Sequence, residues 1–376
     1  MRLSDFTEIN PYEKLPKGTI AKKISMEQLE PYEKFVSGYS LEAYSGGAKF
    51  RNGDTIMARI TPCLENGKTA FVSTLDKNEV GFGSTEYIVF RAKDGISHPD
   101  FVYYLVISSL VREPAIKSMV GSSGRQRVQQ TVIDELEVPN YSLAEQQHIV
   151  DILGTLDEKI ENNSKILNEL NNLIQLEFEK TIFANSSEER LLADVFAFQE
   201  GPGIRNWQYV DKGINFINIR CINDGDIDTS SMNKISEQEA YGIYKHFLLN
   251  EWDLVMSMSG TLGRYAIVGK EHLPLCLNTS VIRFYPKNDF TYYSYMYAYL
   301  TSKDFIASIT TLANGSAQQN VGPTHLKKVT IKLPNEEVIK QFHQRVFPLI
   351  NRMVSLRGDN QKIKELKEYY LKKFFG

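Results

Sequence analysis

The chain has 376 residues, of which 42% are hydrophobic and 24% are charged. This length exceeds what one ordinary hydrophobic core supports and suits two domains of usual size. The composition excludes a disordered or fibrous chain. The net charge of −3 excludes a broadly basic surface, so any contact with nucleic acid has to use local clusters of lysine and arginine.

The three cysteines, Cys63, Cys221 and Cys276, lie far apart, and no two of them have the spacing of metal ligands. Reduced thiols in a cytosolic protein are the plain interpretation. The amino terminus lacks the apolar core of a signal peptide. The most apolar stretch, residues 101–111, is too short to span a bilayer. We therefore expect a soluble cytoplasmic protein with no membrane partner.

The first half of the chain contains a series of distinct segments. In chain order they are an opening segment at residues 2–6, Arg-Asn-Gly-Asp-Thr-Ile-Met-Ala at 51–58, Gly-Lys-Thr-Ala at 67–70, and a Ser-Thr pair before an apolar run at 84–90. An aromatic-rich stretch at residues 101–120 follows, and we expect it to be helical.

A small polar loop at residues 121–127 comes next, followed by an apolar alternation that stops at Pro139. Alternation bounded by turn residues predicts a strand. A long helix is expected after Ser142, because Ser142 and Glu145 have the spacing of a capping box.

The second half repeats these segments in the same order. Matching segments occur at residues 191–195, 250–257, 263–266, 278–284 and 292–313. A polar loop at 315–320, an alternation that stops at Pro334 and a second long helix then follow, with Asn335 as its expected N-cap. Because the order of the matches is the same, chance is a poor explanation, and the chain is predicted to be an internal repeat.

Both long helices have apolar positions that recur in alternating steps of four and three, which is typical of a coiled-coil seam. About 40 residues at 1.5 Å each give a helix roughly 60 Å long. Pro348 is expected to kink the second helix or to mark its effective start. The predicted pairing residues are Leu153, Leu156, Ile160, Asn163, Leu167, Leu170, Leu349, Met353, Leu356, Asn360 and Ile363.

The predicted fold is therefore α+β, with two pseudo-repeated mixed α/β domains that are each followed by a long helix. The expected boundaries are 1–141 for the first domain, 142–184 for the central helix, 185–333 for the second domain and 334–376 for the C-terminal helix. Packing in a larger helical bundle is the alternative for the stripes, but no third or fourth helix is present to complete a bundle. The two helices are expected to pair as an antiparallel coiled coil.

Together these segments resemble the specificity subunits of type I restriction–modification enzymes over essentially the whole chain. The polar loops, the strands ending at Pro139 and Pro334, the helix opening at residues 143–147 and the Ser-Gly-Thr-Leu-Gly-Arg turn at 259–264 carry the resemblance. The second helix lacks a Glu-Gln-Gln-like opening, and the first half lacks the Ser-Gly-Thr turn.

The resemblance implies a subunit without chemistry of its own, in which each target-recognition domain reads one half of a bipartite target on double-stranded DNA. It implies that the helices fix the spacing and dock methyltransferase (modification) subunits, with a restriction/translocase subunit completing the complex. S-adenosylmethionine, ATP and Mg would be bound by those partners, and no cofactor or metal is expected in this chain.

The DNA prediction rests on polar side chains in and near the two loops. Arginine forks suit guanine or phosphate, and glutamine and asparagine suit the adenine edge. An ordinary turn residue or a solvated charge is the alternative for each one. The candidates are Arg59, Thr61, Lys68, Ser84, Arg125, Gln126, Arg127, Thr261, Arg264, Asn278, Thr279, Ser316, Gln318, Gln319 and Asn320.

Motifs for catalysis are incomplete. Asn10-Pro11-Tyr12 lacks the second proline of the adenine methyltransferase tetrapeptide, and Gly67-Lys68-Thr69 lacks the earlier glycine of a phosphate-binding loop. The Asp/Glu-x-Lys groups at residues 157–159 and 365–367 lie on the seam helices and are expected to be solvated charge pairs. A single-chain restriction or methylation enzyme is therefore disfavoured. A coiled-coil adaptor without sequence-specific DNA binding stays open as the second alternative.

Asn163 and Asn360 lead to one sharper prediction. Asn163 occupies a d-type position and Asn360 an a-type position, and antiparallel pairing places a opposite d. Two amides can bond to each other in an apolar seam, whereas one amide facing leucine would cost on the order of 1–3 kcal/mol. We expect the two asparagines to meet within one layer and to fix the register.

Overall fold

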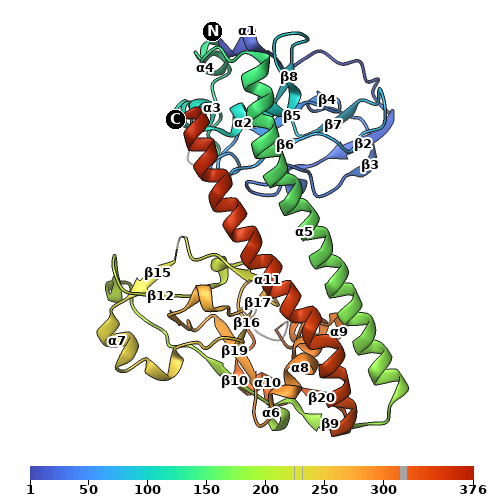
Figure 1. Cartoon of the computed structure of the whole chain (residues 1–376), viewed down its shortest axis with the longest axis vertical. Helices are drawn as coiled ribbons and strands as arrows, with labels where there is room; N and C mark the ends of the chain where they lie inside the picture. The colour runs from blue at the N-terminus through green and yellow to red at the C-terminus, as the bar shows by residue number, and fades with distance from the viewer. Residues whose placement is uncertain (123, 224, 231, 314–319) are drawn as a thin grey trace. The chain divides into compact units, whose positions relative to one another are not determined.

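The structure is a computed structural model of the whole chain (Figure 1), and it describes residues 1–122, 124–223, 225–230, 232–313 and 320–376. Two compact units are present. The first unit comprises Met1–Asn163 and Asn360–Gly376, and the second comprises Ser164–Asp359. Both long helices contribute to both units. The two-domain prediction therefore matches the number of units.

The first half of the chain begins with a mixed α/β domain and ends in the first long helix. Its helices and strands are α1 Leu3–Phe6, β1 Thr7–Ile9, β2 Ile20–Ile24, β3 Ser40–Ala43, β4 Lys49–Phe50, β5 Thr55–Ala58, β6 Thr69–Phe71, β7 Gly81–Gly83, β8 Tyr87–Ala92, α2 Pro99–Ile107, α3 Ser109–Lys117, α4 Gln130–Glu135 and α5 Leu143–Ala184.

The second half of the chain contains the corresponding elements and the second long helix. They are β9 Ser187–Leu191, α6 Leu192–Val195, β10 Phe196–Glu200, β11 Tyr209–Val210, β12 Ile214–Phe216, β13 Ile222–Asn223, β14 Asp226–Ile227, β15 Asn233–Ile235, α7 Glu237–Tyr241, β16 Leu254–Ser257, β17 Tyr265–Ile267, β18 Leu275–Cys276, β19 Val281–Pro286, α8 Tyr293–Leu300, α9 Lys303–Ala313, α10 Pro323–Leu326, β20 Thr330–Pro334 and α11 Glu336–Phe375.

The main sheet has the same topology in both units. Its strand order is β1-β8-β5-β6 in the first unit and β10-β19-β16-β17 in the second, with all neighbours antiparallel. The registers also correspond, since Ala58 lies opposite Tyr87 and Ser257 lies opposite Val281. The sequence repeat is therefore a structural repeat.

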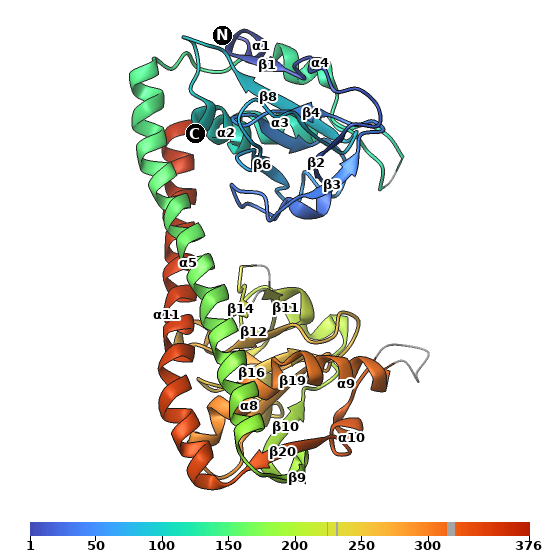
Figure 2. The same ribbon diagram turned by 90° about the vertical axis from the view of Figure 1, so that its right-hand side faces the viewer.

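Each main sheet is covered by helices and accompanied by a second, smaller sheet (Figure 2). The smaller sheets have the orders β3-β2-β7-β4 and β11-β15-β12-β18. The cores between sheet and helices are apolar and aromatic, as the fully buried Phe90 and Phe101 illustrate in the first unit and Phe284 and Tyr295 in the second.

The long helices run antiparallel within each unit. In the first unit, Asn163 of α5 contacts Asn360 of α11, and Asp157 of α5 contacts Lys367 of α11. The residue numbers therefore fall along α5 as they rise along α11. In the second unit, Glu177 of α5 pairs with Arg345 of α11 at 3.4 Å. The predicted antiparallel pairing is confirmed.

Both predicted helix starts carry their predicted caps. The Ser142 backbone N–H donates to the Glu145 carboxylate at 2.7 Å, and the Glu145 N–H donates back to the Ser142 hydroxyl at 3.3 Å. The Asn335 side chain accepts from the Val338 N–H at 3.0 Å. These side chains satisfy amides that have no partner within the helix.

Three local expectations need correction. The two aromatic-rich stretches are helical as expected, but each is divided into two helices, α2 and α3 in the first unit and α8 and α9 in the second. The alternation before Pro139 is a single bridge between Arg2 and Glu137, whereas the one before Pro334 is strand β20. Of the two roles expected for Pro348, marking the start of the second helix is excluded, because Pro348 lies well inside α11, and a kink there stays a prediction.

The predicted seam residues are buried or partly buried. Leu153, Ile160, Met353 and Leu356 are at most 4% exposed, and Leu156, Leu167, Leu170, Leu349 and Ile363 are partly buried. Ile350 is fully buried, so the seam of α11 passes through Ile350 as well as beside Leu349.

The asparagine prediction is confirmed. The Asn163 amide Nδ2 donates to the Asn360 Oδ1 at 2.7 Å, and Asn163 is fully buried. By contrast, the expectation of solvated charges on the seam helices is only partly right: Glu158, Lys159 and Glu365 are exposed, but Asp157 and Lys367 are not. Both side chains are buried and form an ion pair at 2.5 Å.

Candidate nucleic-acid interface

The polar loop of the first unit is joined to the end of strand β5 by backbone hydrogen bonds. The Arg59 N–H donates to the Glu86 carbonyl at 2.9 Å, and the Arg59 carbonyl accepts from the Val128 N–H at 2.9 Å. The Thr61 N–H donates to the Gln126 carbonyl at 3.0 Å. Residues that are distant in sequence therefore meet at one corner of the domain, which we call the first corner.

The second unit has an equivalent corner. The Met258 N–H donates to the Ser280 carbonyl at 3.2 Å, and the Met258 carbonyl accepts from the Val321 N–H at 2.9 Å. Ser259 and Asn320 form a bridge, as Ile60 and Arg127 do in the first unit. By these bonds Arg59, Glu86 and Arg127 correspond to Met258, Ser280 and Asn320.

The cations of the first corner differ in how they are held. Arg127 forms an ion pair with Glu86 at 2.7 Å. The Lys68 ammonium donates to the Met26 carbonyl at 2.7 Å. Among the described residues, the Arg59 side chain makes one hydrogen bond, to the Val128 carbonyl at 3.5 Å. Arg125 is exposed, and its side chain has no hydrogen-bond partner among the described residues.

The polar neutral candidates of the first corner are less accessible. The Ser84 hydroxyl accepts from the Glu86 N–H at 3.0 Å, so it supports the turn that carries Glu86. Thr61 and Gln126 are half-buried. The seven candidates of the first half lie in this region, because the Lys68 carbonyl accepts from the Ala58 N–H at 3.0 Å and the Arg125 carbonyl accepts from the Arg127 side chain at 3.5 Å.

In the second corner, Thr261 and Arg264 are exposed. The Asn278 side-chain Oδ1 accepts from both the backbone N–H and the hydroxyl of Ser280 at 3.0 Å. The Thr279 hydroxyl donates to Glu200 at 3.4 Å. Asn320 is exposed. Three further candidates, Ser316, Gln318 and Gln319, lie outside the described residues.

Two carboxylates at the corners were not among the sequence candidates. The hydrogen bond and charge of Arg127 lower the pKa of Glu86. Burial raises the pKa of Glu200, against the effect of its hydrogen bond with Thr279. Glu86 directly follows the Ser-Thr pair that identified the repeat, so its position was available from sequence, but its arginine partner lies 41 residues away.

The described parts of the chain contain no cluster of three or more His, Cys, Asp or Glu side chains arranged to hold a metal ion. No helix within those parts is both long enough and apolar enough to cross a membrane.

The α/β domain is duplicated, and each copy has a polar corner and is followed by a long helix. This architecture defines a class of proteins with two equivalent candidate binding domains. Residues 1–172 and 185–368 each match the family model described as "Type I restriction modification DNA specificity domain". The chain belongs to this family and carries two copies of its domain.

Individual relatives agree with this assignment. The chain is 22% identical over 318 residues to the type I restriction enzyme MjaVIII specificity subunit of Methanocaldococcus jannaschii, covering 76% of this chain and 75% of that protein. It is 35% identical over 105 residues to the EcoAI specificity subunit of Escherichia coli, covering 28% of this chain but only 18% of that protein.

The fold is also found in a solved structure. The type I restriction–modification system S subunit from M. genitalium aligns with a TM-score of 0.55 and 15% identity, covering all of this chain and 95% of that one. At this identity the likeness concerns the fold, and it includes both domains and both helices.

Proposed function

We propose that this chain is the non-catalytic, cytoplasmic DNA-reading subunit of a type I restriction–modification complex, with each domain reading one half of a bipartite target. One observation carries the proposal. The two corners share a backbone arrangement but present different side chains, Arg59, Glu86 and Arg127 against Met258, Ser280 and Asn320. A common scaffold with different donors and acceptors suits two readers of different sequence.

The helices are proposed to set the spacing of the two half-sites and to dock the partner subunits. In the second unit, α5 exposes Leu173, Leu176 and Phe183, which are 50%, 60% and 95% exposed. In the first unit, α11 exposes Leu366 and Tyr369, which are 43% and 59% exposed. Apolar side chains left uncovered on a helix mark a surface for another protein.

The proposed occupants of these helix surfaces are modification subunits, and a restriction/translocase subunit joins that assembly. S-adenosylmethionine, ATP and Mg are assigned to those partners. Double-stranded DNA is the ligand of the corners.

Exchange of one domain tests the two-reader proposal. Residues 1–141 would be replaced by the corresponding domain of another specificity subunit, and the methylated sequence of the reconstituted complex would be determined by sequencing. We expect one half of the target to change and the other to stay. A change in both halves would contradict the proposal.

The docking surface can be tested separately. Leu173→Asp together with Leu176→Asp should reduce co-purification of the modification subunit, and the exposed change Glu169→Ala on the same helix is the matched control. Full assembly of the double variant would place the partner elsewhere.

The adaptor alternative is tested by a DNA shift assay with and without modification subunits. A net charge of −3 provides little non-specific attraction to phosphate. The isolated chain is therefore expected to bind weakly and to gain specificity in the complex. Nanomolar, specific binding by the isolated chain would contradict the need for partners, and no specific binding by the complex would favour the adaptor.

A further inference from the structure

The Glu86 carboxylate holds one edge of the Arg127 guanidinium. Arg127 Nε donates to both oxygens of Glu86 at 3.0 and 2.9 Å, and its Nη2 donates to one of them at 2.7 Å. A guanidinium carries five N–H donors in a rigid plane. The pair with Glu86 therefore fixes this plane while using only the Nε side of it.

The opposite edge of the same guanidinium remains largely unused. Its Nη1 makes one long contact, 3.5 Å to the Arg125 carbonyl, which is at the outer limit for a hydrogen bond. The Arg127 side chain is 46% exposed, and that of Glu86 is 23% exposed. Two parallel N–H donors, one on Nη1 and one on Nη2, are thus accessible to a ligand that approaches from solvent.

The backbones of Arg127 and Glu86 are both fixed by hydrogen bonds. Arg127 exchanges two backbone hydrogen bonds with Val120, at 3.0 and 2.9 Å. The Glu86 carbonyl accepts from Arg59, and its N–H donates to Ser84. A donor pair held in this way loses little conformational entropy when it binds.

We propose that Arg127, oriented by Glu86, reads a guanine in the major groove of the half-site bound by the first unit, and that Glu86 is its positioning residue. Guanine presents O6 and N7 as two adjacent acceptors that match an arginine fork. A phosphate could also accept from Arg127, but a phosphate contact does not require the carboxylate, which repels it. This inference rests on the proposed DNA-reading function.

The second corner provides the internal comparison. Ser280 and Asn320 occupy the positions of Glu86 and Arg127. No carboxylate-held fork is present among these residues. The second unit therefore does not read a guanine by this arrangement, and changes at Glu86 affect one half-site only.

The experiment uses the full chain assembled with its modification subunits and a randomised duplex DNA library. Methylated molecules are sequenced, which gives the base preference at every target position. Glu86→Gln keeps the size of the side chain but removes its charge and one acceptor. Arg127→Lys keeps the charge but removes the fork. Glu42→Gln, which alters the exposed pair of Glu42 with Lys23 in the same unit, is the matched control.

The native complex is expected to require guanine at one position of the first half-site. Glu86→Gln and Arg127→Lys should each lower the preference for guanine at that position by about tenfold, with the other positions and the control unchanged. An even loss at all positions, or a first half-site without guanine dependence, would overturn the inference and leave the proposed function intact. A native complex without any preferred sequence would overturn both.

Discussion

The two units attach α5 to their domains by different chemistry. In the first unit, the Asp157 carboxylate accepts from the Tyr104 hydroxyl at 2.7 Å and forms an ion pair with Lys367 of α11. In the second unit, the Gln175 amide donates to the Ala298 carbonyl at 3.2 Å and to the Thr301 hydroxyl at 2.9 Å. Helix α5 is thus joined to the first domain by a buried charged side chain and to the second domain by a neutral amide.

The charged network of the first unit extends into its domain. Lys34 is buried, and its ammonium donates to the Tyr104 hydroxyl at 3.2 Å and to Asp100 at 2.7 Å. Residues from the domain, from α5 and from α11 are therefore linked through one chain of polar contacts, which runs from Asp100 to Lys367.

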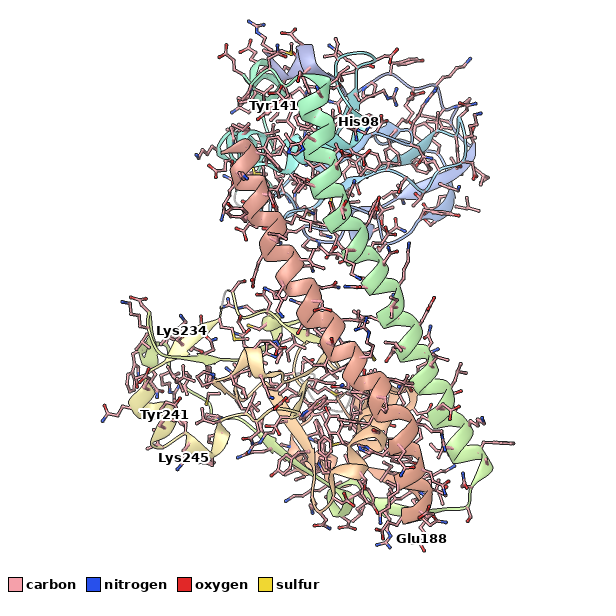
Figure 3. All side chains as sticks on the ribbon, in the orientation of Figure 1. His98, Tyr141, Glu188, Lys234, Tyr241 and Lys245 are labelled. Carbon is pink, nitrogen blue, oxygen red and sulfur yellow. The ribbon has the colours of Figure 1, made fainter. Side chains whose placement is uncertain are left out.

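Figure 3 labels His98 and Tyr141 beside the start of α5, where the Gln146 side chain accepts from the His98 N–H.

In the second unit, α5 is attached mainly by aromatic and aliphatic burial. Phe178 of α5 lies edge-on to Tyr295 and to Phe342 of α11, with ring centres 5.1 and 6.3 Å apart. Ile350 and Met353 of α11 are at most 1% exposed in the same core. Apolar contacts are strong but tolerate small shifts.

The difference has a consequence for register. A buried ion pair contributes little net stability, because desolvation offsets the attraction, but a misaligned partner is costly. We therefore expect a shift of helix register to destabilise the first unit more than the second. We expect the second unit to contribute more apolar stabilisation.

Asp157→Ala should have the largest effect. It leaves the Lys367 ammonium buried without a counter-charge, which costs about 3–5 kcal/mol in the free energy of unfolding. Urea unfolding, with hydrogen exchange assigning the loss to peptides of the first unit, measures it. The double variant Asp157→Leu with Lys367→Met is the control and should be close to native. A small loss for Asp157→Ala alone would show that the buried pair is not costly to break.

Ile350→Ala tests the apolar attachment of the second unit. Removing a fully buried aliphatic side chain of this size costs about 3 kcal/mol, because transfer and cavity terms add. Hydrogen exchange should increase in peptides of the second unit. The control is Asn351→Ala at the neighbouring exposed position, which should change little. Equal losses for the two variants would argue against a core around Ile350.

Asn163→Ala should have an intermediate effect of about 1–2 kcal/mol, since it leaves the Asn360 amide without its partner in a partly apolar seam. Replacing both asparagines by leucine should restore or raise stability while weakening the register. Cysteine cross-linking between α5 and α11 would detect shifted pairs in the double variant. A single register in that variant would show that the ionic network of the first unit suffices.

Much of the fold could be predicted because its signals are local and repeated. The repeat order indicated two equivalent domains, and the heptad phase of Asn163 and Asn360 located their contact before any tertiary information. Local capping residues located both helix starts. These features depend on spacing along the chain, which sequence shows directly.

Tertiary pairing was less accessible. Asp157 and Lys367 each belong to an Asp/Glu-x-Lys group, and on an isolated helix such a group indicates solvent exposure. Only the packing of α5, α11 and the first domain buries these two side chains. The single bridge at Glu137 in place of a strand has the same origin, because the alternation lacks a neighbouring strand such as β9, which pairs with β20 in the second unit. Glu86 was missed because its role depends on Arg127 across the corner.

The smallest expected effect concerns His343 in the second unit. Its ring stacks on Phe347, and its Nδ1 lies 2.9 Å from the Ser294 hydroxyl. Burial lowers the pKa of His343 below its ordinary value of 6.5, and the Asp289 carboxylate offsets this only in part. Between the folded pKa and 6.5 the unfolded state binds more protons, so the free energy of unfolding falls as the pH falls through that interval.

Hydrogen exchange of the second unit should therefore accelerate as the pH is lowered below 6.5, after correction for the intrinsic pH dependence of exchange. His343→Gln removes the titrating group and should flatten this dependence. Peptides of the first unit, measured in the same sample, are the control and should not respond to the substitution. An unchanged pH dependence in the Gln variant would contradict this prediction. It would mean that a group other than His343 takes up the proton in the second unit.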